Sequence, residues 1–296
     1  MKSLFLFLPL ALVACLAPPA TRAAEPGLQG KLERVYLDWR GAIMAKSMDT
    51  WTRSTAIYRQ MTARNLIISQ KLRYPDAIFD LPMQPPDILP LKLIEVEAVG
   101  PTAHLVYFGR VNLGLDIESK DLPESLLLLK FYQEPAGWKF DTSRLIQLAD
   151  APEIKKQLQG DKLEFLKEPA FTPSGTVPAT PKPCRAPDYV AALRIEAMGY
   201  EVEATMNGVD YPMVRDDAVQ QLIIGGLVRG DNSIKLHIKA LPIPDGEERV
   251  LEVQVVIITG EEKKPINRVF RWSPEAAPPE SVELPVKVNI ATLKGA

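Results

Sequence analysis

The sequence is poor in the residues that most often carry chemistry, because its 296 residues include only two cysteines and two histidines. His104 and His237 lie far apart in the chain, and nothing has the Cys and His spacing of a transition-metal site, so we expect no metal ion. Cys15 falls in a predicted signal segment, which leaves Cys184 without a partner for a disulfide in the mature chain. No motif specifies a nucleophile with its base, and we expect no cofactor.

Net charge and long apolar runs are scarce as well. The formal net charge of -2 leaves no basic field to attract phosphate backbones, which excludes nucleic acid as a partner. No apolar run of the mature chain approaches the roughly 20 residues of a membrane-spanning helix, so we expect no transmembrane segment. With 46% hydrophobic and 24% charged residues, the composition is that of a folded protein, and the length suffices for two domains.

The N-terminus has the parts of an export signal over residues 1–23: Lys2, an apolar run over residues 4–14, and a region of small residues. Two interpretations stay open. Residues 12–15, Leu-Val-Ala-Cys, are similar to a lipobox, in which Cys15 carries a lipid anchor. Alternatively, the signal is cleaved after Ala23 and the protein is released. Both predict an extracytoplasmic protein, either periplasmic or secreted, or attached to the outer membrane through Cys15.

A proline-rich stretch over residues 168–187 divides the chain. Proline fixes φ and removes a backbone donor, so neither a helix nor a central strand is expected to run through it. The sequence therefore predicts a linker between one domain over residues 29–167 and another over residues 188–289, followed by a tail over residues 290–296. A catalytic thiol needs a positioned base, which a linker does not offer, so we expect no catalytic role for Cys184.

The first domain begins with helical periodicity and continues with alternating strands. Apolar spacing predicts helices over residues 32–43, 51–71 and 152–159, with Arg59 on a solvated face. Alternation and turn residues predict strands over residues 91–99, 103–113, 126–133 and 138–146. Helices followed by antiparallel strands predict an α+β domain in which helices pack on one curved sheet.

Two segments of this domain resemble the NTF2-like superfamily: the turn Ser47–Trp51 and the hairpin Leu128–Asp141, with Gly-Trp-Lys at the start of its second strand. The resemblance covers residues 32–149. It implies a bent sheet that wraps around a long helix as a cone, and pairing of two copies through this domain as a homodimer. The superfamily includes enzymes, ligand-binding modules and oligomerisation domains, so the fold does not give a function.

Enzymes of this superfamily place an acid or base inside the cone, which makes His104 and Asp141 the candidate catalytic residues and Tyr107 and Trp138 candidate ligand contacts. Strand alternation puts His104 and Tyr107 on opposite faces, which argues against a catalytic dyad. Structural roles compete with the catalytic ones. We expect His104 to be a core or edge histidine, Asp141 a strand-end or turn residue, and Asp49 a helix cap.

The second domain shows strand patterns only, over residues 189–197, 200–206, 220–224, 233–240, 250–259, 266–272 and 282–288. Asn207-Gly208 is a strong signal for a tight hairpin. Many short strands with frequent turns predict an all-β sandwich. Residues 206–208 and 227–234 are similar to those of jelly-roll or Ig-like accessory domains, which implies either binding to a carbohydrate or a protein, or a role that only spaces or stiffens a larger molecule. Tyr200, Tyr211 and Trp272 are the aromatic side chains expected to be exposed for such a ligand.

The leading hypothesis is an exported, non-catalytic binding or scaffolding protein of the bacterial cell envelope, with a protein or glycan partner. One alternative is an enzyme or small-ligand-binding protein that uses the pocket of the first domain. Another is a carbohydrate-binding module in the sandwich. The interior of the first domain separates these hypotheses: an open cavity faced by a titratable side chain favours a ligand, whereas apolar filling excludes chemistry there.

Overall fold

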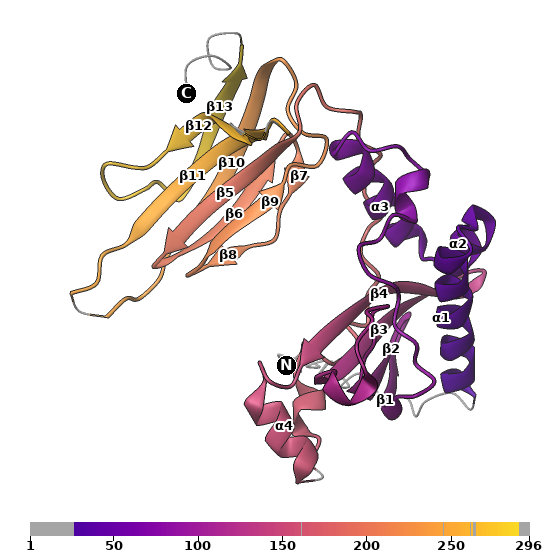
Figure 1. Cartoon of the computed structure of the whole chain (residues 1–296). Coiled ribbons are helices and arrows are strands. Elements are labelled where there is room, and N and C mark those ends of the chain that lie inside the picture. The colour runs from indigo at the N-terminus through magenta and orange to yellow at the C-terminus, as the bar shows by residue number, and fades with distance from the viewer. Residues whose placement is uncertain (1–26, 161, 245, 261, 263–264, 290–296) are drawn as a thin grey trace, which may run out of the picture.

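The computed structural model describes residues 27–160, 162–244, 246–260, 262 and 265–289. The predicted signal segment with Cys15, and the tail over residues 290–296, lie outside these residues. The described chain folds into helices and three antiparallel sheets, which confirms the predicted α+β class (Figure 1). None of its helices combines the length and the apolar character needed to cross a membrane.

The first domain is built on a four-stranded antiparallel sheet with the strand order β1-β2-β3-β4. Its strands are β1 (Lys92–Val99), β2 (Thr102–Arg110), β3 (Glu124–Glu134) and β4 (Gly137–Gln147). Its helices are α1 (Leu28–Met44), α2 (Met48–Ser54), α3 (Ile57–Ser69) and α4 (Pro152–Gln159), with short 3-10 helices at Asp76–Ile78, Ser119–Asp121 and Glu164–Lys167.

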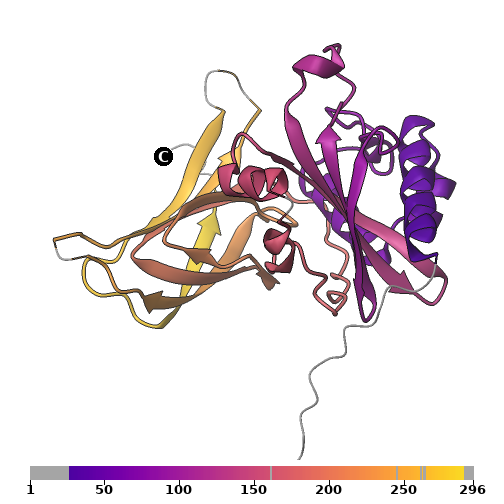
Figure 2. The same cartoon turned by 90° about the horizontal axis from the view of Figure 1, so that it is seen from below.

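Both faces of this sheet are covered, as Figure 2 shows, with α1 on one side and α4 on the other. Leu32 and Tyr36 of α1 pack against Leu105, Leu129 and Phe140 of the sheet, and all five are buried. On the opposite face, Val106, Leu126 and Leu128 pack with Phe165 and Phe171, which follow α4 in the chain. Alternation along β2 therefore separates two cores, and Tyr107 shares the core on the α1 side with Ala103 and Leu105, as the predicted alternation requires.

The helix predicted over residues 51–71 is wrong in one respect, because the chain forms two helices there. α2 ends at Ser54, and α3 begins at Ile57. Between them Thr55 forms a parallel bridge with Phe140 of β4, and the Ala56 N–H donates to the Phe140 carbonyl at 2.8 Å. A backbone bond to a distant strand, which local periodicity cannot show, ends the first helix and fixes the start of the second.

The second domain consists of two sheets that share one apolar core. One sheet has the order β13-β10-β6-β7, with β8 also paired to β6, and the other has the order β12-β11-β5-β9. Asn207 and Gly208 join β6 and β7 with φ values of 50° and 79°, as the hairpin signal predicts. The strands are β5 (Ala191–Met198), β6 (Tyr200–Met206), β7 (Val209–Asp210), β8 (Val214–Arg215), β9 (Ala218–Leu222), β10 (Gly230–Ala240), β11 (Val250–Ile258), β12 (Ile266–Trp272) and β13 (Ser281–Val288).

Helix α3 joins the proline-rich stretch and the second domain to the first. The Asn65 amide donates to the Lys182 carbonyl at 2.8 Å and accepts from the Cys184 N–H at 2.9 Å. The Ser69 hydroxyl accepts from the Gly225 N–H at 2.7 Å. Polar side chains on one helix thus hold the linker and a loop of the second domain by their backbones.

Candidate functional site

A cavity of about 310 Å³ opens where α1, α2, α3 and β4 meet. Its volume falls at the lower end of the range that small-ligand pockets occupy. Its wall is mostly apolar and aromatic, with an arginine, an aspartate and two hydroxyl side chains among the lining residues. The lining residues are Trp39, Ile43, Trp51, Arg59, Ala63, Leu66, Ile67, Ala77, Ile78, Leu81, Phe140, Asp141, Thr142 and Ser143.

Asp141 reaches this cavity through an irregularity in β4. Lys130 of β3 pairs with Thr142, and Phe131 pairs with Phe140, so Asp141 is an extra residue with no partner across the strand pair. Consecutive residues of a regular strand point to opposite faces, but here both Phe140 and Asp141 line the same cavity. A β-bulge of this kind redirects a side chain and is frequent beside functional sites.

The prediction that Asp141 is a strand-end or turn residue is therefore wrong. Asp141 lies inside β4, with only 4% of its side chain exposed. A bulge depends on the register between two strands, and this register is not visible in the sequence of one strand. The candidate residue remains a candidate, now with a defined position beside a cavity.

The positive charge of Arg59 on α3 offsets the negative charge of the buried Asp141 carboxylate. Its Nε donates to Asp141 Oδ1 at 3.0 Å, and its side chain is 33% exposed. The predicted solvated position of Arg59 is thus wrong, because α3 leans on β4 at the bulge. Among the described residues, no hydrogen bond occupies the two terminal nitrogens of Arg59, which leaves planar donors at the cavity for a carboxylate.

Tyr132 of β3 adds a third polar group beside the pair. Burial raises the pKa of Tyr132 well above its ordinary value, and the charge of Asp141 and a hydrogen bond to it raise the pKa further. The Tyr58 ring lies edge-on to it at 6.1 Å between centroids. Tyr132 is therefore held as a neutral phenol that can donate to Asp141, and it is not poised to act as a base.

The apolar side of the cavity is an aromatic wall. The ring centroids of Trp39 and Phe140 are 4.3 Å apart, and Trp51 is 3% exposed. Ile43 and Ile67 pack in the same cluster as Trp51. Such a wall favours a flat or aliphatic ligand body, while Arg59 and Asp141 recognise a polar end.

The chain matches no known family model, no curated protein and no solved structure. A role for the cavity must therefore be argued from its own residues. Within the part of the chain that the structure describes, no group of three or more His, Cys, Asp or Glu side chains could hold a metal ion.

His104, the other candidate catalytic residue, does not line this cavity. It is 1% exposed, and its Nε2 lies 3.6 Å from Glu97 Oε2 on the neighbouring strand β1. Glu97 favours the protonated ring, but burial and, to a smaller degree, the charge of Lys130 lower the pKa of His104 to about 4. At neutral pH it is an uncharged core residue, and the structure does not bring it together with Asp141 in one site.

Tyr107 and Trp138, the candidate ligand contacts of the first domain, belong to the core under α1. The Tyr107 hydroxyl donates to Glu33 Oε1 at 2.9 Å, and burial, followed by this hydrogen bond, raises its pKa. Trp138 is half-buried against the same core. Neither residue lines the cavity at Asp141.

The expected cap at Asp49 is wrong, because Ser47 takes that place. The Ser47 hydroxyl accepts from the Thr50 N–H, whereas Asp49 lies in the first turn of α2 and pairs with Arg53 at 2.7 Å. A serine two residues earlier satisfies the same free N–H groups. Asp49 is largely exposed and lies outside the cavity.

The aromatic candidates of the second domain point toward its core. Tyr200 is 8% exposed, so its expected exposure is wrong. Tyr211 packs against the core, its hydroxyl accepts from the Ile224 N–H at 2.8 Å, and burial raises its pKa to about 12. Trp272 is half-buried on the same core. Of the three candidates, Tyr200 is buried, and Tyr211 and Trp272 are partly buried against the core of the domain.

The cavity also contains residues that sequence reasoning missed. Ala77 and Ile78 come from the short 3-10 helix Asp76–Ile78, and Leu81 follows it, in a segment for which the sequence predicts neither a helix nor a strand. The one available signal was the apolar character of residues 77–79, which is unusual for a solvated loop. The return of this segment onto α1 and α3 depends on long-range packing, and local patterns do not show it.

Proposed function

We propose that this chain is an exported, non-catalytic two-domain binding protein of the bacterial cell envelope. In this proposal the first domain holds a small ligand with an aromatic or flat apolar body and a carboxylate. The observation that carries it is the cavity of about 310 Å³, whose lining combines the pair of the buried Asp141 and the partly exposed Arg59 with tryptophan and phenylalanine side chains. The free terminal nitrogens of Arg59 match a carboxylate, and the aromatic wall matches the body.

The lining residues favour binding over catalysis. Asp141 Oδ1 already accepts from Arg59, and the described lining residues include no histidine or cysteine. General acid-base catalysis needs a group that can exchange a proton within about 3 Å of a substrate atom. An aspartate that is held by an arginine beside two hydroxyl side chains fits recognition of a polar group better than proton transfer.

The NTF2-like fold and the export signal are further parts of this proposal. A cavity between the end of a long helix and a bulged antiparallel sheet is the arrangement expected of an NTF2-like cone, and the resemblance of residues 32–149 supports this interpretation. The basic residue, apolar run and small residues of the N-terminus support export. The second domain is proposed to act as a partner-binding or spacing module, because its aromatic side chains are used in its own core.

The four tryptophans provide a direct test. Trp39 and Trp51 line the cavity, so their indole N–H signals in a ¹⁵N-labelled sample report ligand entry. Trp272 lies in the other domain, and its signal is the internal control. We expect 2-naphthoate to shift the signals of Trp39 and Trp51 and to leave that of Trp272 unchanged. Methyl 2-naphthoate, which lacks the charge, should bind about tenfold more weakly if Arg59 contacts the carboxylate.

A variant with a filled cavity serves as the control for binding at this site. Ala63→Leu adds a larger side chain to the wall and should abolish the shifts, while the remaining signals of the same spectrum show whether the domain is folded. Equal shifts in the wild type and in a folded A63L variant contradict binding in this cavity. Equal affinity for the acid and the ester contradicts the assigned role of Arg59.

A further inference from the structure

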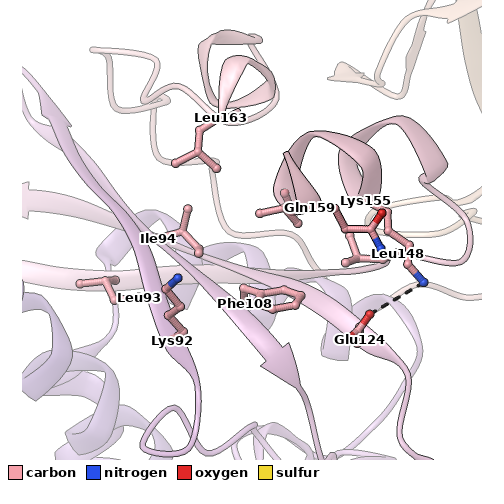
Figure 3. A pocket seen from close by; sticks show the side chains of 10 residues that line it. Lys92, Leu93, Ile94, Phe108, Glu124, Leu148, Lys155, Gln159 and Leu163 are labelled. Carbon is pink, nitrogen blue, oxygen red and sulfur yellow. Dashed lines mark ion pairs between the residues drawn. The ribbon is translucent and has the colours of Figure 1, made fainter. Parts of the chain in front are cut away.

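A second cavity, of about 320 Å³, lies on the opposite face of the same sheet, between the strands and α4 (Figure 3). It is separate from the cavity at Asp141, with which it shares no lining residue. Its floor comes from the strands and its roof from α4 and the residue that precedes the next 3-10 helix. The lining residues are Lys92, Leu93, Ile94, Phe108, Glu124, Leu148, Lys155, Leu158, Gln159 and Leu163.

The cavity lies where α4 covers only part of its face of the sheet. Leu158 of α4, and Ile94 and Phe108 of the strands, pack against the core that contains Leu148 but are themselves only partly buried. Leu163 extends over them from the other side and is itself 38% exposed. An apolar floor and an apolar roof thus face each other across an open gap, as Figure 3 shows.

Positive charge at the rim is unbalanced. Lys155 Nζ lies 3.8 Å from Glu124 Oε2, so these two side chains offset one another. Lys92 stands on the exposed first residue of β1, and among the described residues no carboxylate lies within ion-pair distance of it. A long lysine stem can lie along the apolar floor and keep its ammonium at the opening.

We propose that this second cavity binds a single-chain anionic amphiphile, in which a carboxylate meets Lys92 and the hydrocarbon chain lies between Phe108 and Leu163. This inference goes beyond the proposed function, because it assigns another ligand to another face of the domain. Contact of the hydrocarbon chain with the apolar residues should raise the affinity roughly fourfold for each methylene that is buried. The unpaired ammonium selects the charged head group.

Calorimetric titration of the full chain without its signal segment tests the proposal, with decanoate below its micelle concentration as the ligand. We expect one decanoate per chain, and octanoate binding roughly 15-fold more weakly because two methylenes are absent. Decan-1-ol, which has the chain without the charge, should bind about tenfold more weakly than decanoate. Equal affinity for the acid and the alcohol would overturn the role of Lys92.

Two exposed positions supply variants that should fold. Lys92→Glu reverses the charge at the rim and is expected to weaken decanoate at least tenfold, whereas Lys92→Arg should retain binding. Leu163→Asn removes the apolar roof and should weaken decanoate by a similar factor. Lys235→Glu, on an exposed position of β10, carries the same change in net charge and should bind as the wild type does. Unchanged affinity in both K92E and L163N overturns the proposal.

The tryptophan signals distinguish the two cavities. Decanoate should leave the indole signals of Trp39 and Trp51 in place, since neither lines the second cavity. Shifts of both signals, with full affinity in K92E, would place decanoate in the first cavity and overturn the proposal. Sedimentation with phosphatidylglycerol vesicles tests whether the amphiphile is a free acid or a membrane lipid. Binding to decanoate without binding to vesicles identifies a free acid as the ligand. Binding to vesicles without binding to decanoate overturns a site for single chains.

Discussion

Replacement of Arg59 by methionine is expected to destabilise the first domain by about 2–3 kcal/mol. Breaking a fully buried ion pair by removal of one partner costs about 3–5 kcal/mol, because a charge is left buried without compensation. Asp141 fits that case, since 4% of its side chain is exposed, but Arg59 is 33% exposed. Water can therefore reach part of the vacated space, which lowers the expected cost to about 2–3 kcal/mol, at or below the bottom of that range.

A double-mutant cycle separates the cost of leaving Asp141 charged and unpaired from the interaction energy between Arg59 and Asp141. Asp141→Asn removes the charge and keeps the shape of the side chain at the bulge. The double variant R59M/D141N leaves no unpaired carboxylate, so it should lose less stability than the sum of the two single variants, with a coupling of about 1–2 kcal/mol. Additive losses would refute a direct interaction between the two side chains.

Urea unfolding provides the measurement. In a Trp272→Phe background, the remaining tryptophans, Trp39, Trp51 and Trp138, all report on the first domain. With a denaturant slope of about 1–3 kcal/mol per molar, the expected loss lowers the urea midpoint by roughly 0.7–3 M. A shift below about 0.3 M in R59M would show that Asp141 does not depend on Arg59 for its burial, and the proposed arrangement of the cavity would be wrong.

Three further predictions concern residues outside the cavity. Tyr36→Phe removes a buried hydroxyl that donates to a backbone carbonyl at 2.7 Å, and should cost about 1–2 kcal/mol in the same urea titration. Burial lowers the pKa of His104 to about 4 in the folded protein, so the unfolded chain binds a proton at this residue more readily. The free energy of unfolding should therefore fall by up to about 3 kcal/mol between pH 6.5 and pH 4, and H104Q should remove that fall. Asn65→Ala releases the linker backbone and should speed tryptic cleavage after Arg185 several-fold, seen on a gel, whereas Gln70→Ala should not.

Elements that repeat a local pattern could be predicted from the sequence. The apolar face of α1, the longer strands of both domains and α4 follow from periodicity, and the Asn207-Gly208 turn follows from the need for positive φ at both positions; the two-residue strands β7 and β8 carry no pattern of their own and are missing from the prediction. These features depend on a few neighbouring residues. The break between α2 and α3 does not, because it is set by the backbone bond from Ala56 to Phe140, far along the chain.

The candidate site is harder to predict from the sequence for the same reason. Asp141 could be named as a candidate from its residue type, but its burial results from a shift in register between β3 and β4. The spacing of charges on the helix predicts a solvated face for Arg59, because this spacing does not reveal which strand lies beside the helix. Local sequence therefore predicts which faces are apolar, whereas long-range register decides which polar residue meets the cavity.

Helix α3 connects the proposed ligand site to the second domain. Arg59, Ala63 and Leu66 line the cavity, while Asn65 and Ser69 on the same helix hold the linker and the Gly225 loop. A ligand can change the coupling of the domains only if it binds more tightly to one position of α3 than to another. Because the cavity wall and the joint are turns of one short helix, any displacement of α3 by a ligand must reach the joint. The N65A variant removes the Asn65 bonds to the linker and keeps the Ser69 bond to Gly225, and Asn65 does not line the cavity, so the variant tests whether ligand affinity depends on the hold of α3 on the linker.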